Sequence, residues 1–132
     1  MEINSALNQQ IGGGHYKKLQ YQPMSFIAKM HLSFSQGCIV KYVSRYRYKN
    51  GLEDLKKAVH YCQLANELSD TSKHTKLLRI MRPKFVKQEI LKYVLCNNLE
   101  GYTGFCIEHA VLSNFKEAES DLQSLIATVY SL

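Results

Sequence analysis

The sequence lacks several features that would assign it to a functional class at once. It has no run of 18 apolar residues and no basic, apolar leader, so we expect a soluble, cytoplasmic protein without a membrane partner. Its four cysteines form no C-x-x-C pair, and no H-x-x-x-H motif accompanies them. We therefore expect reduced, mostly buried cysteines and no tightly bound metal.

A phosphate-binding loop of the Walker A type is also missing. Residues 11–18 read "IGGGHYKK", but no apolar strand precedes the glycines, and Lys17 is followed by Lys18 rather than Ser or Thr. A Walker A loop needs that strand, the hydroxyl residue and a helix that begins at the loop. These glycines are therefore better explained as a flexible lead to the residues that follow.

The positive charge is concentrated in one third of the chain. The 132 residues, enough for one domain, have a net charge of +6. Residues 15–57 contain nine Lys or Arg against two acidic residues, whereas residues 58–132 contain eight of each. This asymmetry indicates a local anionic partner, either nucleic acid, nucleotide phosphates or an acidic protein, with a merely solvated basic surface as the alternative.

The pattern of apolar residues predicts an all-α fold. No alternation of apolar and polar residues supports a sheet, and Pro23 is placed to begin a short helix. Helices over about 35–48 and 52–68 should form a compact antiparallel hairpin that ends and restarts around Gly51. The second of them should bury Leu55, Ala58, Val59, Cys62 and Ala65.

The C-terminal half should add further helices to a single domain of residues 1–132. We expect a connection at 69–75, a helix from Pro83 to about Asn97 with core residues Phe85, Ile90, Val94 and Leu95, and a final helix that ends near Tyr130. The domain would then consist of a flexible lead (1–14), a basic half (15–68) and a C-terminal helical half (76–132). The stripe of Leu122, Leu125, Ile126 and Val129 suits either core packing or another subunit, and we expect a homo-oligomer.

The helix over 35–48 combines an apolar face with a cationic one. At 100° per residue, one face holds Ile39, Tyr42, Val43 and Tyr46, and the opposite face holds Gly37, Lys41 and Arg45. Lys41 and Arg45, four residues apart, could bind the same phosphate, so we expect both to point away from the core and to form an anion site with His15. Gly37, costly in a helix, would allow close approach of a ligand or another helix.

The same region resembles a known protein family. The segments "HYKKLQYQPMSFI" and "LSFSQGCIVKYVSRYRYKNGLEDLKKAVHY" are similar to a small bacteriophage family of formerly unknown function that includes the T7-type phage nucleotide kinase. The likeness covers about residues 14–61, with Cys38 standing where that family commonly has Asn. It implies a nucleotide-binding protein, acting in an infected or prophage-carrying bacterial host, that could transfer phosphate to nucleoside monophosphates without a P-loop.

Carried onto this chain, the resemblance implies a set of site residues. His15 and Asp54 would be catalytic, with Asp54 able to hold a Mg²⁺ that accompanies the nucleotide. The nucleotide and its phosphates would be bound by Tyr16, Lys17, Lys41, Tyr42, Arg45, Lys49 and Lys57. Two other functions remain open: a protein that sequesters a nucleotide or nucleotide signal without chemistry, and a nucleic-acid or protein binder that uses the basic face.

Overall fold

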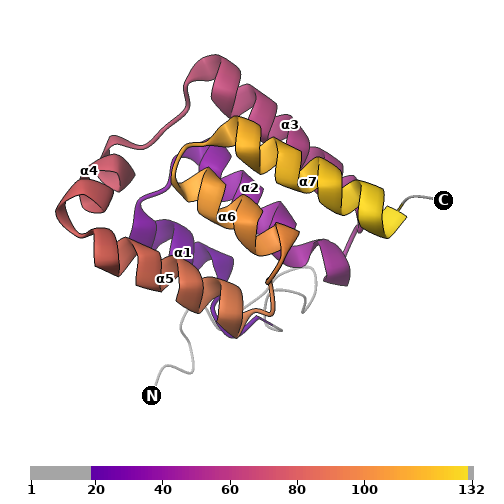
Figure 1. Ribbon diagram of the computed structural model, residues 1–132, viewed down its shortest axis with the longest axis horizontal. Helices are drawn as coiled ribbons and strands as arrows, with labels where there is room; N and C mark the ends of the chain where they lie inside the picture. The colour runs from indigo at the N-terminus through magenta and orange to yellow at the C-terminus, as the bar shows by residue number, and fades with distance from the viewer. Residues whose placement is uncertain (1–18, 131–132) are drawn as a thin grey trace.

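The computed structural model describes residues 19–130, and all of the regular structure in that range is helical (Figure 1). This confirms the all-α prediction. The elements are α1 (Pro23–Met30), α2 (Phe34–Arg45), the 3₁₀ helix η2 (Tyr46–Tyr48), α3 (Leu52–Leu68), α4 (Lys73–Met81), α5 (Pro83–Cys96), α6 (Tyr102–Val111) and α7 (Phe115–Tyr130).

Four helices form the centre of the molecule. Helices α2 and α3 run side by side in opposite directions, α7 packs against α3, and α6 fills the place between α7 and α2 (Figure 1). The hairpin begins with a capping box, in which the Ser33 hydroxyl accepts the Gln36 backbone N–H and the Gln36 side chain accepts the Ser33 N–H. The apolar residues of α3 that were predicted to be buried are all buried, which confirms the predicted core of the hairpin.

Helices α1 and α5 pack beside this group and are joined to it by aromatic side chains. Phe26 of α1 and Tyr93 of α5 are fully buried and stack with ring centroids 4.4 Å apart. The Tyr93 hydroxyl then lies 2.6 Å from the Ser44 hydroxyl of α2. These contacts connect residues distant in the sequence, and the buried side chains of α1, α2, α3, α5, α6 and α7 belong to one hydrophobic cluster.

Several predicted boundaries and core positions differ from the structure. Helix α2 ends at Arg45 and continues as η2, and the predicted connection at 69–75 contains the start of α4. Helix α6 was not predicted. Leu95 is 51% exposed because α5 turns Val86, Ile90 and Val94 inward, and Leu95 is one step around the helix from Val94.

The apolar stripe of α7 is used inside the molecule. Leu122 and Leu125 are buried against the core, and Ile126 packs against its edge. Val129, in the last turn, is 52% exposed. Core packing therefore accounts for most of this stripe, and self-association needs another surface.

No helix within residues 19–130 has the length and apolar character needed to cross a bilayer.

Candidate functional site

The hairpin forms an open pocket lined by basic and aromatic side chains. This hairpin pocket has a volume of about 490 Å³ and is lined by Tyr42, Glu53, Lys56, Lys57, His60 and Tyr61. Tyr42 comes from α2 and the other five from α3, whose successive turns place positions 53, 56, 57, 60 and 61 along one face. Antiparallel packing of the two helices therefore assembles this pocket.

Three cations surround the Tyr42 ring. The Lys41 Nζ, Arg45 Cζ and Lys57 Nζ atoms lie 4.9, 4.7 and 5.5 Å from its centroid. The ring also lies 5.9 Å from that of Tyr61, with an angle of 18° between the planes. The electron-rich face of Tyr42 attracts these positive charges and so offsets part of their mutual repulsion, and the stacked rings of Tyr42 and Tyr61 give the pocket an aromatic wall.

Arg45 does not point away from the core, so that prediction is wrong. It is 7% exposed, and its Nε and Nη2 donate to the two carboxylate oxygens of Asp54 at 3.3 and 3.2 Å. Asp54 is fully buried and also accepts the Asn50 backbone N–H at 3.2 Å. The ion pair draws Arg45 inward because an unpaired buried carboxylate would be far more costly than a paired one.

The structure brings together part of the predicted site. Lys41, Tyr42, Arg45, Asp54 and Lys57 meet across the hairpin. Lys49 is exposed in the turn between η2 and α3 and does not line the pocket. His15, Tyr16 and Lys17 lie outside the described residues.

Four pocket residues were not predicted as site residues: Glu53, Lys56, His60 and Tyr61. A sequence signal for them exists, because Glu53, Lys57 and Tyr61 follow one another at four-residue intervals on α3, as do Lys56 and His60. Glu53 and Lys57 form an exposed ion pair at 3.7 Å. The 100° rotation per residue, applied to the helix predicted at 52–68 as it was to the one at 35–48, would have placed these residues beside Lys57.

The aromatic wall continues beyond the pocket. The Phe34 ring, 73% exposed, meets the Tyr61 ring edge-on at 5.9 Å. The half-buried Cys38 thiol is hydrogen-bonded to Tyr61; burial raises the pKa of this thiol, and the Tyr61 hydroxyl and Lys41 offset part of that rise. Cys38 thus contacts the aromatic wall at the position where the resembling family commonly has Asn.

Gly37 serves helix packing in this structure. It is buried, and a β-carbon added to it would lie 3.3 Å from Cγ2 of Ile27 in α1. Of the two explanations for this glycine, the close approach of another helix is the one observed. The residue therefore contributes no wall to the hairpin pocket.

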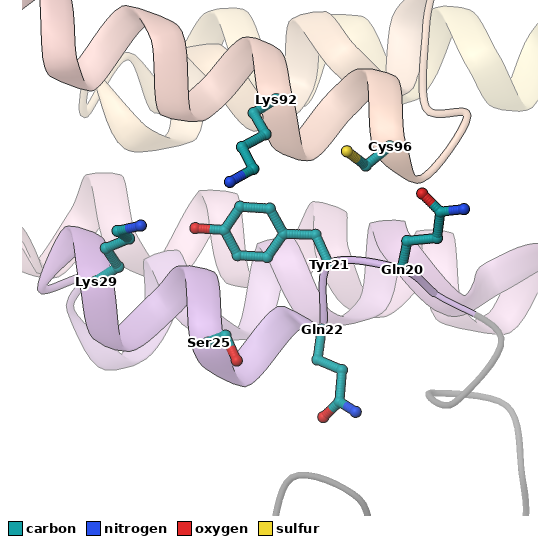
Figure 2. A pocket seen from close by; sticks show the side chains of 7 residues that line it. All are labelled: Gln20, Tyr21, Gln22, Ser25, Lys29, Lys92 and Cys96. Atoms are coloured by element: carbon teal, nitrogen blue, oxygen red, sulfur yellow. The ribbon is translucent and has the colours of Figure 1, made fainter. Parts of the chain in front are cut away.

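A second pocket lies between the segment that precedes α1 and helix α5. This Tyr21 pocket has a volume of about 520 Å³ and is lined by Gln20, Tyr21, Gln22, Ser25, Lys29, Lys92 and Cys96 (Figure 2). The Tyr21 ring crosses its middle, with the lysine ammonium groups toward the hydroxyl end and Gln20 and Cys96 toward the other end (Figure 2). None of the predicted site residues within 19–130 lines this pocket.

The cysteines are divided between core and surface. Cys62 and Cys106 are buried next to each other, and Cys38 and Cys96 are partly exposed. A hydrogen bond to Cys62 and burial raise the pKa of the Cys106 thiol well above its usual value. Within residues 19–130, no three His, Cys, Asp or Glu side chains are grouped as metal ligands.

One comparison with known proteins gives a match. A family model described as a protein of unknown function (DUF3310) matches residues 11–63, a range that includes α1, α2 and most of α3. The description of that family names no activity. No curated protein and no solved structure matches the chain.

Proposed function

We propose that the protein binds a nucleotide, or a ligand derived from one, in the hairpin pocket. The observation that supports this most strongly is the convergence of Lys41, Arg45 and Lys57 on the ring of Tyr42 beside an open cavity. A cavity of about 490 Å³ is within the usual range for small-molecule sites, roughly 300–1,000 Å³. The positive charge of the first third of the chain is consistent with an anionic ligand.

The pocket offers separate contacts for the two parts of a nucleotide. Lys56 and Lys57 can bind phosphate oxygens through charge-assisted hydrogen bonds, and His60 can donate another. The nearly parallel rings of Tyr42 and Tyr61 offer an aromatic surface for a base. Arg45, already paired with Asp54, would act as a positioning residue that holds the Tyr42 ring.

Phosphoryl transfer, which the family resemblance implies, is a finer proposal. A kinase generally needs carboxylates that place Mg²⁺ against the phosphates. The carboxylate oxygens of Asp54 already accept hydrogen bonds from Arg45 and Asn50 in a fully buried setting, and Glu53 is the other carboxylate at the pocket. This donor set does not fit a Mg²⁺ held by the described residues, so we favour binding without turnover, as in a sequestering protein of a phage-infected cell.

The experiment is a thermal-shift screen of nucleoside mono-, di- and triphosphates and cyclic dinucleotides, followed by calorimetry on any ligand found. A ligand that binds the folded state raises the melting temperature by mass action. Lys57→Gln should then weaken binding roughly tenfold, the usual effect of one lost charge-assisted hydrogen bond. Lys84→Gln, an equal charge change on the exposed face of α5, is the control.

Two results would reject the proposal. The first is a screen in which no nucleotide shifts the melting temperature, and the second is an equal loss of affinity in Lys57→Gln and Lys84→Gln. A nucleic-acid binder would instead show a steep fall of affinity with salt on single-stranded DNA or RNA. Incubation of the same preparation with ATP, Mg²⁺ and nucleoside monophosphates tests phosphoryl transfer directly.

A further inference from the structure

The Tyr21 pocket has a wall that is fixed before any ligand binds. The Asn97 side chain, 2% exposed as a residue, accepts the Tyr21 backbone N–H at 3.1 Å and donates to its carbonyl at 2.7 Å. The Tyr21 ring packs edge-on against Phe26 and Tyr93 at 5.7 and 5.2 Å. Tyr21 is therefore held at its backbone and at its ring, as a preorganised binding surface requires.

Two lysine ammonium groups share one carboxylate beside this pocket, so one positive charge is in excess. Glu89 accepts the Tyr21 hydroxyl on Oε2 at 2.9 Å and pairs with Lys29 through Oε1 at 3.3 Å, so both of its oxygens are engaged. The Lys92 Nζ lies 5.7 Å from the Tyr21 ring centroid, and no carboxylate within residues 19–130 lies within 4 Å of it. The pocket therefore has a net positive charge near the Tyr21 hydroxyl.

We propose that the Tyr21 pocket is a second anion-binding site, which takes a small molecule with a phosphate or carboxylate at one end and a neutral polar group at the other. The anionic group binds the Lys92 ammonium, with Lys29 beyond the Tyr21 hydroxyl (Figure 2). The neutral end extends along the ring toward Gln20 and Cys96, which offer an amide and a thiol. A volume of about 520 Å³ accommodates a molecule the size of a sugar phosphate.

This site is independent of the nucleotide proposal. No residue in the described part of the chain lines both pockets. The elements also differ, since the hairpin pocket uses α2 and α3 and the Tyr21 pocket uses residues 20–22, α1 and α5. The protein could therefore bind two anionic molecules at once.

The two partly exposed cysteines allow the sites to be followed separately. Cys96 lines the Tyr21 pocket, Cys38 contacts Tyr61 beside the hairpin pocket, and Cys62 and Cys106 are buried. The full chain is treated with a thiol reagent with and without ribose 5-phosphate, glutarate or ribose, and labelling of each cysteine is measured by mass spectrometry. Amide chemical shifts of Gln20, Tyr21 and Lys92 are recorded in parallel and decide the outcome if Cys96 is unreactive.

We expect ribose 5-phosphate or glutarate to slow labelling of Cys96 and to shift these amides, and neutral ribose to do neither. Protection by one anion alone identifies the phosphate or the carboxylate as the preferred group. Lys92→Gln should raise the anion concentration that half-protects Cys96 roughly tenfold or more. Lys84→Gln and Lys57→Gln should leave that concentration unchanged. The proposal is overturned if neither anion affects the pocket, if the effect survives Lys92→Gln, or if Lys57→Gln abolishes it.

Discussion

Within residues 19–130, Arg45 and Asp54 form the ion pair whose two partners are both buried. Both residues lie in the interior, with 7% and 0% of their surfaces exposed, and they join the end of α2 to the first turn of α3. Two charges taken out of water are tolerated because each compensates the other. The same pair fixes the guanidinium 4.7 Å from the Tyr42 centroid, so stability and the candidate site depend on one contact.

We predict that Arg45→Ala lowers the free energy of unfolding by about 3–5 kcal/mol, because it leaves the Asp54 carboxylate buried without its counter-charge. Urea denaturation measures this change. Lys41→Ala is the matched control, since Lys41 is half-buried and has no ion pair within residues 19–130. A double variant, Arg45→Met with Asp54→Leu, should recover much of the loss; equal losses in Arg45→Ala and Lys41→Ala would contradict the prediction.

The sequence could not place Arg45 because a helical pattern describes one helix at a time. At 100° per residue Arg45 lies about 60° from Tyr42, so it is at the border of the apolar face of α2 and not on the opposite face, where it was predicted to lie. What turns it inward is Asp54, nine residues later on another helix. The residues that the pattern placed well, Ile39 and Val43, are those whose burial depends on hydrophobicity alone.

For the helices, the sequence predicted bounds and buried faces correctly where the local apolar spacing agrees with the tertiary packing. The bounds and buried face of α3 could be read from its sequence because its apolar spacing is regular. Helix α4 was missed because polar Thr75 is buried by hydrogen bonds to a distant segment: its hydroxyl donates to the carbonyls of Met30, the last residue of α1, and of His31, which follows it. Helix α6 was missed because Gly101, with φ of +81°, precedes the helix rather than ending one.

We predict that Gly104→Ala destabilises the junction of α5 and α6. A β-carbon there would lie 2.7 Å from the Leu99 carbonyl oxygen and 3.0 Å from Cγ1 of Val94. The backbone oxygen cannot move without distorting the loop, so we expect a loss of about 1–3 kcal/mol. Gly37→Ala is the comparison, because its β-carbon would meet side-chain atoms of Ile27, the nearest being Cγ2 at 3.3 Å, and no backbone atom.

Thermal and urea denaturation of Gly104→Ala and Gly37→Ala measure how much stability each variant loses. A loss in Gly104→Ala that exceeds the loss in Gly37→Ala supports the observed approach of α6 to the loop. A Gly104→Ala variant as stable as the original would show that this approach is looser than described, because alanine favours a helix interior by roughly 1 kcal/mol over glycine.

For the whole molecule, Glu89 connects the first described segment to the C-terminal half. It pairs with Lys29 of α1 and accepts the hydroxyl of Tyr21. Burial raises the pKa of Glu89, but the Tyr21 hydroxyl and the Lys29 and Lys92 ammonium groups outweigh this and hold it below its usual value. Folding therefore favours the ionised form of Glu89, and ionisation of Glu89 in turn stabilises the folded state.

We predict that these contacts of Glu89 make the free energy of unfolding depend on pH in the acid range. Because the folded pKa lies below the unfolded value of about 4.3, the stabilisation is complete above that pH and is lost as the pH falls through the folded pKa. Glu89→Gln keeps an acceptor for Tyr21 but removes the charge. The free energy of unfolding of Glu89→Gln should therefore lie below that of the original chain at pH 7, and the two curves should converge as the pH falls below the folded pKa of Glu89. Urea denaturation between pH 3 and 7 measures this difference, with Glu117→Gln on the exposed face of α7 as the control. A gap that stays constant over this range would mean that Glu89 stabilises the fold by packing and not by its charge.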